Sequence, residues 1–350
     1  MLDKIKKYFN TVMFLVIIFA ICIANIFVPD RDFSDMENRV LQTLPTFSWE
    51  DLIDGKFTAD FEDYVSDQTV LKDEWVKLKT TFNLLILNKS QNGVTLDGDK
   101  YYQDFVYNEE YFDTNIGHIN QFIETQKIPV KFFAIPTSDG IYNSSAQKDL
   151  LTKIDNLTIY NALNEHKDEY IYYKTDHHWT TLGAKYAYEA ITGTKVDIEP
   201  EKISDSFLGT LYSKAPTFFS TYDEMYKYDY DQYLKTLKIE DTNKYSKTFF
   251  FDDLLETKDK YSYYIGGNNA SVNIKTNSES GKKVLIFKDS YTHSMIPFFA
   301  KDYSEIQVLD LRYLNIDLKS YIEKGKFDEI YMIYNVDFLN TDVNFYKLNK

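Results

Sequence analysis

The residues with the clearest potential for acid–base chemistry lie in the segment YYKTDHHWTTLG, residues 172–183. The chain has five histidines, and two of them, His177 and His178, are adjacent here and follow Asp176. Imidazole titrates near neutral pH, and a carboxylate that bonds one ring nitrogen fixes the tautomer. Residues two apart in extended chain point the same way. Asp176 is therefore expected to hold one nitrogen of His178, while the other nitrogen is free to act as a base.

A nucleophile for this base is offered by the segment VLIFKDSYTHS, residues 284–294. Its apolar start predicts a buried strand, and a short helix is expected next, so Ser290 falls at a strand-to-helix turn. A hydroxyl there is exposed, and the serine N–H near the helix start can stabilise an oxyanion. A serine hydroxyl needs a base, which His178 can supply. A simple helix-capping role for Ser290 remains open.

Two other interpretations of the histidine pair also remain open. Asp176, His177 and His178 could bind a metal, although neighbouring residues seldom converge on one ion and no second ligand cluster is obvious. The pair could also be purely structural. The only cysteine, Cys22, lies in the apolar N-terminal run, so a disulfide, a cysteine-based metal site and a cysteine nucleophile are excluded from the folded part. We predict no metal and no other cofactor.

The elements that must position these residues alternate between strands and helices. Strands are expected at residues 128–136, 169–175, 282–290, 305–311 and 328–335. Helices are expected at residues 181–191, 292–303 and 318–325, and residues 197–280 read as irregular. This alternation predicts an α/β fold with a parallel sheet flanked by helices. Ligands of such sheets bind beyond the carboxyl ends of the strands, where Asp176, His178, Ser290, Arg312 and Asn335 are expected.

The N-terminal region predicts a membrane segment followed by an arm. Residues 11–28 are apolar, nearly the ~20 residues needed to span a bilayer. Lysines ahead of them favour a cytoplasmic N-terminus with the remainder outside. We favour an uncleaved anchor over residues 1–28, and a cleaved signal peptide is the alternative. Residues 29–92 predict an extended and helical arm, and residues 93–350 the catalytic domain, entered through a hairpin at 93–102.

The overall charge narrows the possible partners. The formal net charge is -15, so we expect no nucleic-acid partner, because such binding needs Lys and Arg to displace counterions. Aromatic residues make up 17% of the chain, enough to build a substantial core. These features fit a well-solvated domain outside the membrane.

The segment TDHHWT together with FKDSY resembles the DHHW family, which is similar to the alginate O-acetyltransferases and belongs to the SGNH-hydrolase-like group. Further blocks, FSDMENRVLQTLP, GVTLDGDKYY, YYIGGNN and VLDLRY, follow in the same order. The resemblance implies an SGNH-hydrolase-like fold. It also implies a triad in which Asp176 orients, His178 is the base and Ser290 is the nucleophile, in agreement with the assignment from the residues.

The resemblance also implies a function and partners. It points to an extracytoplasmic O-acetyltransferase acting on a cell-surface or secreted polysaccharide, supplied with acetyl groups by a multi-pass membrane O-acyltransferase. A carbohydrate acetylesterase and a non-catalytic glycan-binding subunit of an export complex remain alternatives. Oxyanion or substrate contacts are expected from Gly267, Asn268, Trp179, Tyr291 and Arg312. The alternatives for these residues are a turn for the glycine–asparagine block, packing for Trp179 and a structural ion pair for Arg312.

Overall fold

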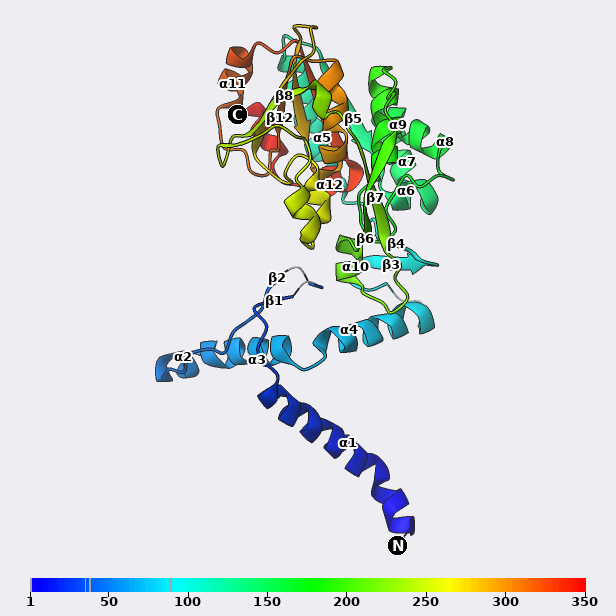
Figure 1. Cartoon of the computed structure of the whole chain (residues 1–350), viewed down its shortest axis with the longest axis vertical. Coiled ribbons are helices and arrows are strands. Elements are labelled where there is room, and N and C mark those ends of the chain that lie inside the picture. Colours follow the sequence, from blue (N-terminus) through cyan, green and yellow to red (C-terminus); the bar gives the residue numbers. More distant parts are fainter. Residues whose placement is uncertain (1, 35, 38, 88–89) are drawn as a thin grey trace. The chain divides into compact units, whose positions relative to one another are not determined.

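The computed structural model describes residues 2–34, 36–37, 39–87 and 90–350, with the side chains of residues 2–7 left out. The described chain divides into two compact units. The first comprises residues 1–91 together with residues 213–219, and the second comprises the remaining residues of 92–350. Figure 1 shows the elements of both units in sequence colours.

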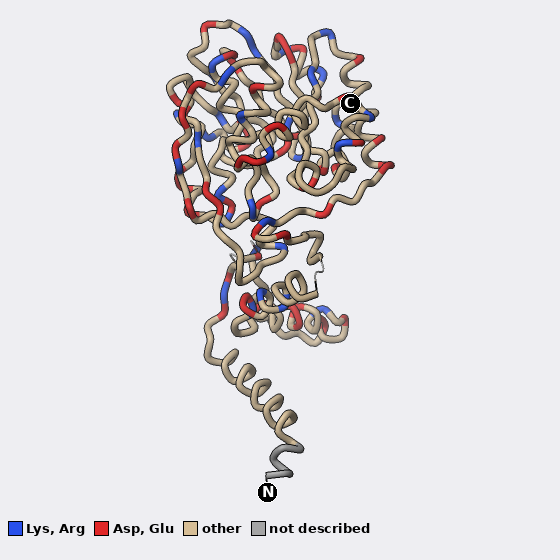
Figure 2. Tube along the Cα trace, turned by 90° about the vertical axis from the view of Figure 1, so that its right-hand side faces the viewer, with Lys and Arg blue, Asp and Glu red and all other residues tan. Residues whose placement is uncertain are grey.

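The first unit begins with the long helix α1, Leu2–Phe27. From Tyr8 to Phe27 it carries no charged residue, and Figure 2 shows this stretch without acidic or basic positions. The mean hydropathy of the stretch is 2.4, and none of it is buried inside the protein. By length and composition, α1 is therefore able to cross a membrane.

The predicted arm is helical. After the short pair β1 (Phe33–Ser34) and β2 (Arg39–Val40) come α2 (Trp49–Ile53), α3 (Lys56–Gln68), α4 (Lys72–Thr81) and a π-helical turn, η1 (Phe82–Ile86). The helical part of the predicted arm is thus present as α3, α4 and η1. Arg39 and Lys72 both bond the buried Asp67 carboxylate and thereby fix the β1–β2 segment to α3.

The second unit is built on a seven-stranded sheet in the order β5-β13-β11-β12-β10-β8-β9. The first four strands are parallel: β5 (Val130–Ile135), β13 (Glu329–Asn335), β11 (Lys283–Lys288) and β12 (Glu305–Leu309). Three of them have nearly continuous apolar runs and are buried on both faces, as parallel strands require. The predicted α/β class with helices around a sheet is confirmed.

The other half of the sheet was missed by the sequence analysis. Residues 197–280 are not irregular: β10 (Ser271–Thr276), β8 (Leu234–Ile239) and β9 (Lys244–Ser246) continue the sheet in antiparallel fashion. A separate antiparallel pair is formed by β6 (Pro200–Phe207) and β7 (Asp223–Tyr228). These strands mix Lys, Asp and Tyr with short apolar stretches, because one face of an antiparallel strand can meet water. The sheet is therefore mixed rather than wholly parallel.

Helices and turns complete the unit. They are α5 (Glu109–Thr125), α6 (Ser138–Tyr142), α7 (Ala146–Lys153), α8 (Thr158–Glu165), α9 (Thr181–Thr192), α10 (Thr210–Lys214), α11 (Leu318–Gly325) and α12 (Val336–Thr341). Phe122 of α5 meets Phe287 of β11 edge to face at 5.6 Å, so α5 covers the parallel strands. The predicted hairpin is present as β3 (Val94–Asp97) and β4 (Lys100–Gln103).

Two predicted elements have different conformations. Residues 169–175 are not a strand of the sheet, and the segment contributes only an isolated bridge between Tyr172 and Trp179. Residues 292–303 do not form one α-helix. They fall in two 3₁₀-helices, η5 (Ser290–Ser294) and η6 (Ile296–Lys301), with Pro297 in the first turn of the second. Proline is tolerated at that position because the N–H it lacks has no partner within the helix.

Candidate active site

Asp176, His178 and Ser290 meet in the second unit although 112 positions separate the last two. His178 Nδ1 lies 2.5 Å from Asp176 Oδ1, and His178 Nε2 lies 2.8 Å from Ser290 Oγ. The ionised carboxylate can only accept, so Nδ1 carries the proton. In the neutral ring Nε2 is then the acceptor, and the Ser290 hydroxyl donates to it. This is the hydrogen-bond chain that an activated serine requires.

The Asp176 carboxylate is buried and held from several sides. It accepts hydrogen bonds from the His178 backbone N–H at 3.0 Å, and from the Thr210 N–H at 2.8 Å and hydroxyl at 3.1 Å. Burial favours the neutral acid, but the charges of His177 and His178 and these hydrogen bonds outweigh it and hold the pKa of Asp176 well below its usual range. The group therefore stays ionised and keeps the His178 tautomer fixed.

Gly209 allows the chain to pass directly over Asp176. A Cβ at this position would lie 2.2 Å from the Asp176 Cβ and 2.4 Å from its Oδ2. Any side chain would push the carboxylate away from His178. The Gly209 N–H also donates to Thr175 Oγ1 at 3.0 Å. This bond fixes the backbone strap at Gly209 and Thr210 over the Asp176 carboxylate.

The segment before Asp176 is held by a side chain in place of strand pairing. The buried Asp223 accepts from the backbone N–H groups of Lys174 and Thr175 at 2.8 Å each, and from the hydroxyls of Thr175 and Tyr170 at 2.5 Å. These bonds do what a neighbouring strand would otherwise do. This explains why a β-rich sequence, EYIYYKT, stays outside the sheet and yet presents Asp176 and His178 in a fixed direction.

The His178 ring is enclosed by aromatic side chains. Tyr261 stacks on it at 3.8 Å between ring centroids and 8° between planes, and Tyr291 lies 5.1 Å away. The Tyr261 hydroxyl donates to the Tyr291 carbonyl at 3.0 Å, which fixes the stacked ring. Burial raises the pKa of Tyr261 far above its ordinary value, so this partner stays neutral. The enclosure leaves the imidazole little rotational freedom.

The turn that carries Ser290 is fixed by the preceding residue. Asp289 accepts from the Tyr291 N–H at 2.9 Å, and from the N–H and side-chain amide of Asn335 at 2.6 and 2.8 Å. Burial raises the pKa of Asp289 to about 6, and the hydrogen bond from the Asn335 backbone opposes the rise. Ser290 itself is half-buried, at the carboxyl end of β11 as predicted.

Trp179 and Tyr291 are interior residues. Trp179 is fully buried, and its indole N–H donates to the Tyr291 carbonyl at 2.7 Å. This burial fits the packing alternative for Trp179. Tyr291 is also buried, with its hydroxyl bonded to the His177 carbonyl and its own N–H bonded to Asp289. Both residues therefore support the base and the nucleophile rather than facing substrate.

The glycine–asparagine block forms a turn. Gly267 has φ +79°, a value that favours glycine, and its N–H donates to the Tyr264 carbonyl at 3.3 Å. Asn268 is exposed, and its Oδ1 accepts from Arg312 at 3.0 Å. The Gly267 N–H is thus engaged within the turn, which argues against it as an oxyanion donor. The Ser290 N–H remains the predicted donor.

Arg312 belongs to a buried charge cluster next to Ser290. It bonds both oxygens of Asp310, at 2.9 and 2.7 Å, and the buried Lys288 reaches the same carboxylate at 3.1 Å. Burial opposes ionisation of Asp310, but Lys288 and Arg312 prevail and lower its pKa. Lys288 also donates to His293 Nε2 at 2.8 Å, and burial keeps the pKa of His293 well below its usual value. These bonds fit the alternative of a structural ion pair for Arg312.

The cluster proposed for a metal is also engaged in hydrogen bonds. The ligand atoms of Asp176, His177 and His178 lie within 4.8 Å of one another. However, His178 Nδ1 faces the carboxylate, and His177 Nδ1 lies 2.6 Å from Thr210 Oγ1. A metal bound through Nδ1 of either ring would have to replace these bonds. The donor set therefore fits a hydrogen-bonded triad better than an ion site.

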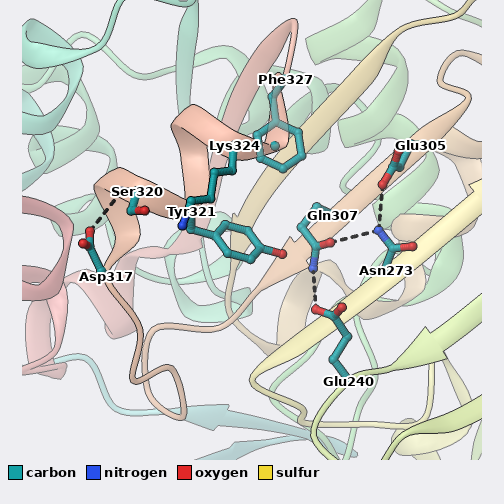
Figure 3. Close-up of a pocket in the computed structure, with 10 residues that line it drawn as sticks. Glu240, Asn273, Glu305, Gln307, Asp317, Ser320, Tyr321, Lys324 and Phe327 are labelled. Atoms are coloured by element: carbon teal, nitrogen blue, oxygen red, sulfur yellow. Dashed lines mark hydrogen bonds between the residues drawn. The ribbon is translucent and has the colours of Figure 1, made fainter.

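The second unit also has two pockets that are not lined by the triad residues. A pocket of about 600 Å³ is lined by four tyrosines, Tyr170, Tyr222, Tyr226 and Tyr228, together with Lys174 and Thr180 on either side of the histidine pair. A groove of about 490 Å³ lies between α11 and the strands β10 and β12, and the triad residues are not among those that line it. Figure 3 shows its polar floor, where Asn273 bonds Glu305 and Gln307, and Gln307 bonds Glu240. The polar side chains of this floor are therefore largely hydrogen-bonded to one another.

The fold is a mixed α/β sheet flanked by helices, and Asp176, His178 and Ser290 form a hydrogen-bonded chain in the unit that carries it. The family model described as DHHW protein matches residues 140–309, which include all three triad residues. The predicted resemblance to this family is therefore confirmed. A search of curated proteins found no match.

Comparison with solved structures found two of similar fold and a third, more distant match. A DHHW family protein from Eubacterium siraeum is 25% identical, with a TM-score of 0.62, covering 75% of this chain and 96% of that one. Bacillus cereus PatB1, solved with a sulfonyl adduct, is 17% identical with a TM-score of 0.60, covering 73% and 98%. The O-acetyltransferase domain of Pseudomonas putida AlgJ is 12% identical, with a TM-score of 0.44, covering 71% of this chain and 93% of that one.

Several supporting residues escaped the sequence analysis. Gly209, Thr210, Asp223 and Tyr261 lie in the region interpreted as irregular, and each contacts the triad or the segment that carries it. None belongs to a recognisable motif. The only local signal was the density of Tyr and Asp between residues 197 and 280, which does not indicate which residues turn toward the site.

Proposed function

We propose that this protein is an extracytoplasmic O-acetyltransferase that modifies a cell-surface or secreted polysaccharide. The observation that carries the proposal is the continuous hydrogen-bond chain from Asp176 through His178 to Ser290, with the carboxylate buried and ionised. Such a chain lets a serine attack an acyl carbonyl at neutral pH. The resemblance to the DHHW family supports the choice of a polysaccharide as the acceptor.

In the first half-reaction Ser290 Oγ attacks the carbonyl carbon of an acetyl donor, and His178 Nε2 takes the hydroxyl proton. The oxyanion is stabilised by the Ser290 N–H, and its collapse expels the leaving group, which receives the proton from His178. The acetyl group is then an ester on Ser290. In the second half-reaction a sugar hydroxyl gives its proton to His178 Nε2 and attacks the ester, and Ser290 leaves with that proton.

The tyrosine-lined pocket is the proposed acceptor site. Its four tyrosines offer flat apolar faces with polar edges, and Lys174 and Glu224 add charged groups at its wall. Tyr222 is 61% exposed and so is free to meet a ligand, in contrast to the buried Trp179. No triad residue lines the pocket, but Lys174 and Thr180, which precede and follow His178 in the sequence, do. The proposed acceptor is therefore a glycan that extends from this pocket toward the triad.

The proposed location is the outer side of the membrane, with α1 as an uncleaved anchor. The 20 uncharged residues from Tyr8 to Phe27, most of them apolar, rise about 30 Å as a helix, close to the hydrocarbon thickness of a bilayer. A multi-pass membrane O-acyltransferase is the proposed source of acetyl groups, because the cytoplasm holds the activated acetyl donors. This partner comes from the family resemblance alone.

The function is tested by replacing Ser290 with Ala in the producing organism and quantifying acetate on its surface polysaccharide. We expect the polymer to lose its acetate while the amount of protein is unchanged. Normal acetylation with the variant would refute the proposal. A polymer that gains acetate in the variant would instead support the alternative of an acetylesterase, which shares the first half-reaction.

A serine-reactive probe distinguishes the proposed enzyme from the alternative, a non-catalytic glycan-binding subunit. PatB1 was solved with a sulfonyl adduct, and the same class of reagent is suited to Ser290 here. An activated serine should react with a sulfonyl fluoride far faster in the wild type than in a His178→Gln variant. Equal labelling of the two proteins would favour the binding subunit. Loss of activity on chelation would favour a metal site at Asp176, His177 and His178.

A further inference from the structure

The helical arm of the first unit exposes an unusual amount of apolar surface. Apolar side chains recur every three or four residues from the residue before α4 into η1, and all of them are open to solvent. They are Leu71, Trp75, Leu78, Phe82 and Leu85, with 45–63% of each exposed. Soluble monomers rarely leave such a stripe uncovered. A surface of this kind is normally covered by a partner or by lipid.

A second row of aromatic side chains, exposed at Phe47, Trp49 and Phe61, begins at α2 and ends beside α1. Trp49, Phe47, Phe57, Phe61 and Tyr64 follow one another at ring-centroid distances of 5.2, 5.3, 6.0 and 6.1 Å. Trp49 is 71% exposed. The Tyr64 hydroxyl donates to Asp30, just after α1, at 3.1 Å. The aromatic row therefore reaches the end of the apolar helix.

Hydrogen bonds hold the junction of α3 and α4 at the end of α1. The Val70 N–H donates to Asn25 Oδ1 at 2.7 Å. Gln68 bonds both the N–H and the carbonyl of Arg31, and Arg31 pairs with Asp73 at 2.9 Å. If α1 spans the bilayer from Tyr8 to Phe27, these contacts hold the arm at the outer boundary between hydrocarbon and water.

The polar side of the arm is already occupied. Asp67 and Gln68 of α3 accept and donate bonds to the segment 31–42, and Lys72 joins Asp67 to Glu37. The apolar side is the one left open. Trp and Phe at the level of the headgroups are typical of helices that lie in the membrane interface.

We propose that α2, α3, α4 and η1 form an interfacial platform whose apolar side lies in the outer leaflet of the bilayer. This inference rests on the proposed anchoring by α1. The occupant is the lipid surface rather than a protein, because the hydrogen bonds to Asn25, Asp30 and Arg31 fix the arm at that depth. Acidic residues outnumber basic ones between residues 49 and 87, so the platform binds neutral lipid through apolar contact, without need of anionic headgroups.

The three tryptophans of the chain provide the test. Trp49 and Trp75 lie on the platform and are exposed, whereas Trp179 is wholly buried in the second unit and serves as the internal control. Three single-tryptophan proteins, made by Trp→Phe exchange at the other two positions, are placed in phosphatidylcholine vesicles whose acyl chains are brominated near the headgroup. The full-length chain is used throughout.

We expect bromolipid to lower the emission of Trp49 and Trp75 at least twofold, with little effect on Trp179, and we expect aqueous iodide to quench neither platform residue. A Leu78→Glu exchange should reduce bromolipid quenching of Trp75 and leave Trp179 unchanged. Resistance to alkaline extraction reports the anchoring by α1 separately. If the protein is anchored but iodide quenches Trp49 and Trp75 and bromolipid does not, the proposed platform is refuted. This result is the one expected if the apolar surface binds a protein partner instead of lipid. Protein that is extracted by alkali overturns the anchoring and the platform with it.

Discussion

At the scale of single residues, the site depends on a carboxylate that accepts and never donates. Asp176 receives hydrogen bonds from His178 and Thr210, and it is this acceptance that leaves His178 Nε2 free for Ser290. An asparagine would have nearly the same size but could offer an N–H to the ring. The ring could then carry its proton on Nε2, where it cannot act as a base.

We therefore expect Asp176→Asn to lower the acyl-transfer rate by roughly 10³–10⁴-fold. The loss should appear in kcat, measured with an activated acetyl ester, and the protein should remain folded. The matched control is His177→Gln. His177 is half-exposed and bonds Thr210 rather than the nucleophile, so its exchange should change the rate only a few fold. Equal losses in the two variants would contradict the assigned roles.

Gly209 makes a steric prediction about the same carboxylate. Gly209→Ala introduces a Cβ 2.2 Å from the Asp176 Cβ, so the acid or the strap must move. We expect lower activity and an unfolding free energy reduced by about 1–3 kcal/mol. Gly117→Ala is the control, because Gly117 lies within α5 with no atom within 4 Å of the new Cβ. It should raise stability by about 0.5–1 kcal/mol. Thermal denaturation and the ester assay measure both changes.

Asp289 predicts how stability varies with pH. Burial raises its pKa to about 6 in the folded protein, above the value near 4 expected when unfolded. The native state therefore binds more protons between these values, so this contribution to stability is complete below about pH 4 and is lost as the pH rises through about 6. The whole change is on the order of 3 kcal/mol.

The measurement is the unfolding free energy from pH 4 to pH 7 in the wild type and in Asp289→Asn. The variant cannot titrate at this position, so the difference between the two curves isolates Asp289 from other carboxyl groups. The wild type should lose stability relative to the variant as the pH rises. Parallel curves would mean that Asp289 titrates normally.

At the scale of elements, the parallel strands and their helices could be predicted, and the antiparallel half could not. The strands β11, β12 and β13 have almost uninterrupted apolar runs because both faces are covered, and such runs are easy to recognise. The strands β8 and β10 carry Lys, Asn and Thr on one side. Their pairing depends on distant partners, for instance Val272 opposite Val308 and Ile239, which local pattern does not reveal.

The segment 169–175 shows a further limit of local pattern. Its β-branched and aromatic residues favour a strand, but the bonds that hold it come from Asp223, about fifty positions later. The triad residues themselves could be predicted because their types and spacing carry the chemistry. The supporting residues Gly209 and Tyr261 act only through position in space, so their roles had to await the structure.

The pocket beside this segment makes a prediction about the acceptor. Tyr222→Ala removes the most exposed of the four tyrosine rings but touches neither His178 nor Ser290. We expect the KM for a polysaccharide or oligosaccharide acceptor to rise about tenfold, corresponding to roughly 1.4 kcal/mol of lost contact. Acylation of Ser290 by an activated ester should be unchanged. Slower acylation of Ser290 with an unaltered KM for the acceptor would contradict the assignment of this pocket as the acceptor site.

At the scale of the whole molecule, the two units have different proposed roles. The first unit provides the surface suited to a membrane, and the second provides the triad and the proposed acceptor pocket. The proposed triad, Asp176, His178 and Ser290, lies within the second unit. The central claim is therefore that Ser290 of this unit carries the acetyl group between donor and acceptor.

The most direct measurement is the mass of the full-length protein after a brief reaction with an activated acetyl ester and acid quenching, followed by peptide mapping. The account predicts one acetyl group, located on Ser290, in the wild type. In the His178→Gln variant this acetyl group should be almost absent, and added acceptor glycan should discharge it from the wild-type enzyme. Ester turnover with an unmodified Ser290, or an acetyl group on another residue that acceptor removes, would contradict the account.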